Sequence, residues 1–193
     1  IIDLITKQRL SATSCMTTKP LWPEHALWLK PYRKQIDIGL HLNFTEDASL
    51  VNLMLKSRLG LLNENDCITA INQQIDQFRQ HLSVEPDFID GHQHIHHFPI
   101  IRDALLKVYQ QQFTTTKPYI RLSDQHTVAH LTDKLKIMVI KMMGVEPFRQ
   151  QLTTRTIPHN TCFAGIYNFN QAKNYPVIFR HFLSKLKPTA LMM

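Results

Sequence analysis

Residues 36–44 read IDIGLHLNF, and large apolar side chains alternate in this stretch with small or polar ones. Successive side chains of a β-strand point to opposite faces, so the alternation predicts a strand with one apolar and one polar face. His41 lies on the polar face, between Gly39 and Asn43. The stretch therefore predicts a strand that packs on one side and presents a histidine on the other.

Helical and strand-like segments alternate along the rest of the chain. Apolar residues spaced by three and four predict helices, and short apolar or alternating runs predict strands. Strands that alternate with helices favour an α/β domain with a largely parallel sheet, either open or closed into a barrel. In both, sites form at the carboxyl ends of the strands. The predicted helices are 2–10, 65–82, one that begins at Pro99, 128–143 and 175–186, and the predicted strands are 11–16, 36–44, 88–92, 119–122 and 189–193.

Length and composition limit the class of protein. The 193 residues predict one domain, and 44% apolar with 19% charged residues is typical of a globular protein. No apolar run approaches the ~18 residues of a membrane span. The net charge of +7 is scattered along the chain, which argues against a nucleic-acid site. Three isolated cysteines argue against a disulfide framework and favour the cytoplasm.

Residues 86–97 read PDFIDGHQHIHH and hold four of the eleven histidines within six positions. If the strand continues extended, Asp90, His92, His94 and His96 share one face and can converge on one ion. Neutral imidazole is a common metal ligand, and a nearby carboxylate completes the metal shell or holds the imidazole tautomer. The alternative interpretation is a histidine cluster on the surface.

Two further residues follow predicted strands in the same way. His41 ends one strand as His92 ends another, and strand ends of an α/β sheet face one crevice. Arg121 ends the strand at 119–122, where it would bind a substrate hydroxyl or carboxylate or stabilise a developing negative charge. A surface salt bridge is the alternative for Arg121.

These motifs resemble the YdjC-like carbohydrate deacetylases, the family of the chitooligosaccharide deacetylases. The resemblance is carried by IGLHLNFT at 38–45 and PDFIDGHQHIH at 86–96, and supported by RLSATSCM at 9–16, YIR at 119–121 and FAG at 163–165. It implies one β/α barrel-like deacetylase domain over residues 1–193. It also implies a divalent metal, magnesium with zinc as the alternative, held by His41 and His92.

The sequence departs from the family pattern at both ends. Members open with a strand that ends in Asp-Asp-Phe-Gly and carry a Cys-His-Pro-Gly segment after the last strand, and neither motif occurs here. We therefore expect the domain to be incomplete at both ends and to lack a metal-binding aspartate. Carboxylate charge supplies much of the attraction for a hard cation, so a site without it should bind metal more weakly.

The reaction implied by the resemblance is removal of acetyl groups from N-acetylated sugars or oligosaccharides. We assign catalytic roles to Asp90 and His96, and substrate contacts to Asn43, His94 and Arg121. The expected partner is a small acetylated sugar or oligosaccharide, with no nucleic acid or membrane, and a homodimer is the assembly considered.

Three alternatives remain from the sequence. HQHIH at 92–96 superficially matches the histidine-triad nucleotide hydrolases, although these have apolar residues where Gln93 stands. A metal-dependent amidohydrolase fits DGHQH, but in that class the motif usually ends the first strand. A histidine-rich metal-binding protein without catalytic activity is the non-enzymatic alternative.

Overall fold

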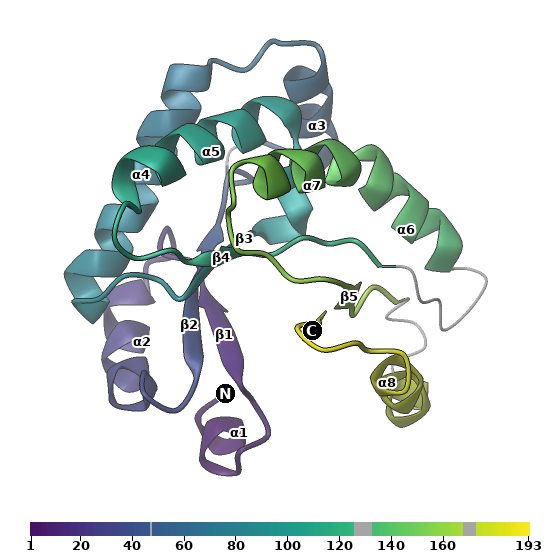
Figure 1. Ribbon diagram of the computed structural model, residues 1–193. Coiled ribbons are helices and arrows are strands. Elements are labelled where there is room, and N and C mark those ends of the chain that lie inside the picture. Colours follow the sequence, from purple (N-terminus) through teal and green to yellow (C-terminus); the bar gives the residue numbers. More distant parts are fainter. Residues whose placement is uncertain (47, 126–132, 168–172) are drawn as a thin grey trace. The chain divides into compact units, whose positions relative to one another are not determined.

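The structure is a computed structural model that describes residues 1–46, 48–125, 133–167 and 173–193 (Figure 1). The chain divides into two compact units, Ile1–Tyr119 and Ile120–Met193. The single domain expected from the sequence stays a prediction.

The first unit combines a parallel sheet with helices, which confirms the predicted α/β class. Its first two strands, β1 and β2, run side by side in Figure 1. The elements, in order, are α1 Ile2–Thr6, β1 Ala12–Cys15, α2 Trp22–Leu29, the 3-10 turn η1 Lys30–Tyr32, β2 Asp37–Leu42, α3 Leu50–Arg58, α4 Glu64–Leu82, β3 Phe88–Gly91, the 3-10 segment η2 His92–His97, α5 Pro99–Gln112 and the start of β4 Tyr119–Ile120.

The sheet has the strand order β1-β2-β3-β4. Ser14 of β1 is paired with Gly39 of β2, and His41 of β2 is paired with Asp90 of β3, both in parallel. Because paired residues of parallel strands point to the same face, these four side-chain positions share one face of the sheet. The opposite face carries Leu40 and its apolar neighbours, as the alternation in residues 36–44 predicts.

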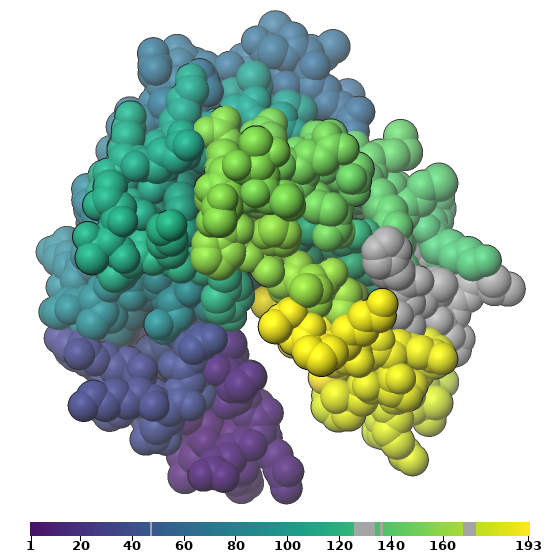
Figure 2. Space-filling model, in the orientation of Figure 1, coloured from purple at the N-terminus to yellow at the C-terminus, as the bar shows by residue number. Residues whose placement is uncertain are grey.

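The longest helix, α4, packs on this apolar face and beside α5, and the side chains of the two helices form a continuous surface in Figure 2. Asn63 caps α4 by accepting hydrogen bonds from the amides of Asn65 and Asp66. The helix ends at Ser83, which adopts a left-handed conformation with φ 59°. Buried residues of the core include Ile38, Leu40, Leu42, Ile71, Ile75, Phe78, Leu82, Ile101, Leu105 and Val108.

The second unit is smaller and holds its own apolar cluster of Ala164, Ile178 and Phe182. Within it, β5 pairs with β6 in parallel. Its elements are the end of β4, α6 Asp133–Met142, α7 Val145–Thr154, β5 Phe163–Ala164, α8 Tyr175–Leu183 and β6 Leu191–Met192.

Most of the predicted elements are present, with shifted ends. Of the helix predicted at 128–143, the structure describes α6 Asp133–Met142, and residues 128–132 lie outside the described residues. Helices α2, α3 and α7 were not predicted. No helix within the described residues has the length and apolar character needed to cross a membrane.

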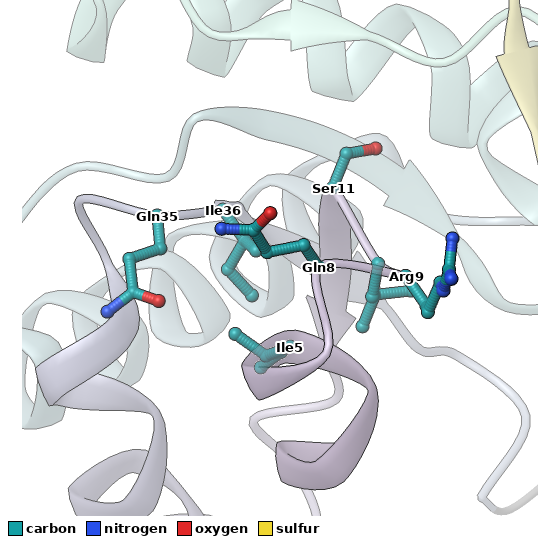
Figure 3. Close-up of a pocket in the computed structure, with 7 residues that line it drawn as sticks. Ile5, Gln8, Arg9, Ser11, Gln35 and Ile36 are labelled. Carbon is teal, nitrogen blue, oxygen red and sulfur yellow. The ribbon is translucent and has the colours of Figure 1, made fainter.

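A pocket of about 600 Å³ opens at the amino ends of β1 and β2 (Figure 3). The chemistry predicted above belongs to the carboxyl ends of these strands, which is the opposite end. In α/β folds the amino end of the strands contributes mainly to stability. The residues lining this pocket are Ile5, Gln8, Arg9, Leu10, Ser11, Gln35 and Ile36.

Candidate functional site

The centre of the candidate site is a hydrogen-bonded pair, His41 and Asp90. The two residues face each other across the β2–β3 ladder, and the distance from His41 Nδ1 to Asp90 Oδ1 is 2.6 Å. Asp90 is buried, with 2% of its surface exposed, while His41 is partly exposed. The parallel register therefore places a buried carboxylate directly beside the imidazole that the sequence singled out.

The pairing fixes the role of each nitrogen of His41. A carboxylate can only accept hydrogen bonds, so Nδ1 carries the proton and Nε2 keeps a lone pair. This is the arrangement in which proteins hold a metal-binding histidine. Ser14 Oγ lies 3.3 Å from the same Nδ1, and sequence reasoning did not assign it a role. The feature of the sequence that could have indicated Ser14 is its position in the predicted strand that precedes β2. In the structure it lies on the same face as Gly39.

The histidine-rich segment does not continue the strand, so its expected extended conformation is wrong. β3 ends at Gly91, and residues 92–97 form the 3-10 segment η2. Gln93 and His94 have φ values of 50° and 63°, in the left-handed region that non-glycine residues rarely adopt. Consequently the histidines of this segment do not share one face.

The first histidine of the segment nevertheless lies beside His41. The ring centroids of His41 and His92 are 5.6 Å apart, at an interplanar angle of 73°. Burial lowers the pKa of His92 below its usual value, the electrostatic effects of the neighbouring His41 and Lys19 lower it further, and Asp90 opposes them. A lowered pKa favours the neutral imidazole, which is the form that binds metals.

Two glycines allow this packing. A Cβ on Gly39 would lie 2.4 Å from the ring of Phe88, and a Cβ on Gly91 would lie 2.7 Å from Nδ1 of His96. The Phe88 ring also stacks on Tyr119, with centroids 5.0 Å apart. The glycines of both motifs therefore serve close side-chain packing beside the candidate site.

The pair of imidazoles fits a shared divalent ion. Two imidazoles that bind one ion have centroids roughly 4.5–6.4 Å apart, because each ring nitrogen lies ~2.1 Å from the metal. The 5.6 Å between His41 and His92 falls in this range. Among the described residues, no group of three or more His, Cys, Asp or Glu side chains is arranged to hold a metal.

The other histidines of η2 occupy different environments. His96 is fully buried, its ring packs against Gly91, and it lies 4.2 Å from the ring of His97. His94 is partly exposed, with its ring 6.5 Å from that of His97. Because His94 is more exposed than His96, it is the better placed of these two residues for contact with a substrate.

Asn43, a predicted substrate contact, is held by hydrogen bonds within the fold. Its Nδ2 donates to Thr18 and Glu46, and its Oδ1 accepts from the amide and the hydroxyl of Thr45. Its backbone amide donates to Gln74 Oε1 at 2.9 Å. The residue thus shapes the loop that follows β2.

Arg121, the other predicted substrate contact outside the histidine segment, belongs to the second unit. It follows β4 directly and is 2% exposed, so the side chain does not lie on the surface. Its guanidinium lies over the ring of Phe163 at 5.8 Å, and Nη1 donates to the sulfur of Met193. The substrate role of Arg121 stays a prediction.

Comparison with known proteins adds the fold and the family. A crystal structure from Enterococcus faecalis, of a protein provisionally described as a cellobiose-phosphate cleavage protein, is similar, with a TM-score of 0.64 and 13% identity. The match covers 98% of this chain and 72% of that chain. No curated protein matches the sequence. The model of the YdjC-like proteins matches residues 1–193. The chain therefore belongs to the YdjC-like family.

Proposed function

We propose that the protein is a metal-dependent carbohydrate N-deacetylase. The observation that carries the proposal is the arrangement of His41, Asp90 and His92 at the carboxyl ends of two neighbouring parallel strands. Two findings connect this arrangement with sugars. The chain belongs to the YdjC-like family. The E. faecalis protein that shares its fold is named for the cleavage of a phosphorylated disaccharide.

In the proposed reaction, water adds to the acetamide carbonyl, the C–N bond breaks, acetate leaves, and the amine takes up a proton. A divalent ion bound there would supply Lewis acidity for the acetamide carbonyl and for the attacking water. His41 and His92 would hold that ion through neutral ring nitrogens. Asp90 would keep the proton of His41 on Nδ1, so that Nε2 would be available to hold the ion.

The other two roles, substrate contact with proton transfer and the positioning of the turn, are assigned to His94 and His96. His94 is partly exposed, so we propose it as the group that contacts the substrate and transfers a proton to or from it. His96 is buried against Gly91, and we propose that it positions the turn that carries His92. A buried group of this kind affects the reaction through the geometry of its neighbours.

The type of ligand atom that the protein offers also affects which metal ion the site prefers. The family resemblance implies magnesium, but magnesium prefers oxygen ligands and imidazole suits zinc and related transition metals. The two imidazoles of this chain therefore favour zinc. After removal of metal with a chelator, we expect Zn²⁺ to restore activity at lower concentration than Mg²⁺. Restoration by Mg²⁺ alone would show that oxygen ligands dominate the shell.

The proposal is tested by replacing the two proposed metal ligands. In His41→Ala and His92→Ala, acetate release from an N-acetylglucosamine oligosaccharide should fall by at least about a hundredfold, and bound metal should be lost with it. Acetate is measured by a coupled assay and metal by atomic emission. The matched control is His25→Ala, because His25 is an exposed histidine on α2 whose ring contacts Trp28 at a tilted angle.

Asp90→Asn tests the part played by the carboxylate. An amide of the same size leaves the packing intact but no longer fixes the His41 proton, so metal affinity should fall about 10- to 100-fold.

Full activity with unchanged metal content in His41→Ala or in His92→Ala would remove that residue from the site. Wild-type protein that binds metal and releases no acetate would favour the non-catalytic alternative.

A further inference from the structure

Ser14 belongs to a set of three polar side chains on three adjacent strands. Ser14 lies on β1, His41 on β2 and Asp90 on β3, and the strand order places β2 between the other two. Ser14 pairs with Gly39, and Asp90 pairs with His41, so the three side chains point from one face of the sheet. Serine and aspartate therefore approach the imidazole from the two neighbouring strands.

Both side chains contact the same ring nitrogen. Asp90 Oδ1 lies 2.6 Å from His41 Nδ1, and Ser14 Oγ lies 3.3 Å from the same atom. Nδ1 carries one proton, and the shorter distance assigns that proton chiefly to the hydrogen bond with the carboxylate. The hydroxyl oxygen has lone pairs, so it accepts a second, longer bond from the same N–H. His41 thus donates a shared hydrogen bond to side chains on both sides of its strand.

This geometry excludes Ser14 as the nucleophile of a serine-type hydrolase. In such enzymes the serine hydroxyl gives its proton to one ring nitrogen of the histidine, while the carboxylate holds the other nitrogen. Here the hydroxyl and the carboxylate lie at the same nitrogen, and that nitrogen already carries the proton donated to Asp90. His41 Nδ1 therefore cannot take the proton of Ser14, and the contact can only hold the ring.

A histidine ring needs such contacts because its own torsion angle does not fix its orientation. The χ2 angle of histidine has a broad preference, unlike the staggered torsions of aliphatic side chains. The hydrogen bond to Asp90 sets the position of Nδ1 but lets the ring rock about that bond. A contact from β1 opposes this motion. The direction in which Nε2 points therefore depends on Ser14 as well as on Asp90.

The surroundings of the three groups strengthen their contacts. The side chain of Asp90 is 3% exposed and that of His41 is 16% exposed, while Ser14 is half-buried. Hydrogen bonds are stronger where water is largely excluded. Gly39, the partner of Ser14 in the ladder, carries no side chain that would separate the hydroxyl from the imidazole.

We propose that Ser14 is a positioning residue that orients the His41 ring for metal binding. It acts through His41 and does not touch the substrate. The orientation of the ring is independent of any metal, whereas its consequence for metal binding rests on the proposed function. Loss of one hydrogen bond of this kind should weaken metal binding about fivefold. Such a loss is far smaller than that expected for a metal ligand.

The first test measures the zinc affinity of the full chain by competition with a coloured chelator. Ser14→Ala and Ser14→Val should bind Zn²⁺ about fivefold more weakly than the wild type, whereas Ser14→Thr should bind equally well. Threonine and valine have nearly the same shape and differ in the hydroxyl, so this pair separates hydrogen bonding from packing. Thr13→Ala is the matched control, since Thr13 lies on the opposite face of β1. Equal affinities of Ser14→Thr and Ser14→Val would overturn the proposal.

A second test needs neither metal nor turnover. In metal-free, isotopically labelled protein, the NMR signals of the two ring nitrogens of His41 report the tautomer and the motion of the ring. The wild type and Ser14→Thr should show narrow signals with the proton on Nδ1, and Ser14→Ala and Ser14→Val should show broadened signals. This outcome would support the proposal even if wild-type protein released no acetate. Identical spectra for the wild type and all three variants would contradict it.

Activity separates a positioning serine from a nucleophile. In Ser14→Ala, acetate release at limiting Zn²⁺ should fall about fivefold and return to the wild-type rate at saturating Zn²⁺. Loss of a nucleophile would instead lower the rate by about a thousandfold or more at every zinc concentration. A loss of that size at saturating Zn²⁺, or covalent labelling of Ser14 by an organophosphate, would overturn the positioning role.

Discussion

Gly39 illustrates how a single position controls the packing beside the site. Any Cβ at this position would meet three atoms of the Phe88 ring at 2.4–2.5 Å. Overpacking of a filled interior typically costs about 1–3 kcal/mol. We therefore expect Gly39→Ala to lower the free energy of unfolding by about that amount, measured by urea denaturation followed by circular dichroism.

A smaller ring partner provides the control for Gly39. In a Phe88→Leu background the added methyl group of Gly39→Ala has more space, so its cost should shrink by more than about 0.5 kcal/mol. The same cost in both backgrounds would show that the contact with Phe88 is not the reason for glycine at this position.

The sequence identified His41, Asp90 and His92 because strand ends converge in α/β sheets, and the structure brings these three together. The turn at Gln93 and His94 could not be predicted, because HQHIH suits an extended strand equally well. Ser14 was missed for a different reason. Its closeness to His41 depends on the pairing register of β1 with β2, which one strand alone does not specify.

Among the elements, α4 depends on its first residues for stability. The Asn63 side chain accepts hydrogen bonds from two amides that have no partner inside the helix. Replacement of such a cap by alanine typically costs about 1 kcal/mol. Asn63→Ala should therefore lower the free energy of unfolding by about 1 kcal/mol in urea denaturation.

Asn65 offers a matched control in the same turn. It is exposed and its side chain caps nothing, so Asn65→Ala should leave the stability nearly unchanged. If both variants had the same stability, the cap would have no energetic role.

Helices with a clean apolar stripe were predictable, and those without one were not. The spacing in α4 gave its bounds to within a residue, and Pro99 marked the start of α5. In α2, no apolar stripe marks the helix, and Pro23 lies in its first turn, where the missing N–H of proline is tolerated. In α3, the apolar residues Val51 and Leu55 are exposed, so no buried apolar stripe in the sequence indicates a helix.

At the scale of the whole molecule, the buried thiol of Cys15 and the phenol of Tyr109 predict that the free energy of unfolding falls at alkaline pH. Burial, with a smaller effect from Asp90, raises the pKa of the Cys15 thiol to about 12, and burial raises the pKa of Tyr109 to about 12. The unfolded chain releases these protons first, near pH 9–10. Unfolding should thus become easier as the pH rises above about 9, up to about 12.

The measurement is the midpoint of urea denaturation at pH 8 and at pH 10.5, which should be lower at the higher pH. Tyr109→Phe removes one of the titrating groups and the hydrogen bond from its hydroxyl to the Pro118 carbonyl. This variant should be less stable at pH 8 but lose less stability on going to pH 10.5. A midpoint that does not change with pH in the wild type would contradict the raised pKa values.

The direct pairing of His41 with Asp90 across two parallel strands limits how this gene can change in length. Inserting or deleting one codon between Asp37 and Leu42 would invert every later side chain of the strand, turning the imidazole toward the apolar helices and a leucine toward the carboxylate. Surviving relatives should therefore gather their insertions and deletions in the connecting loops and keep the spacing of β2 intact.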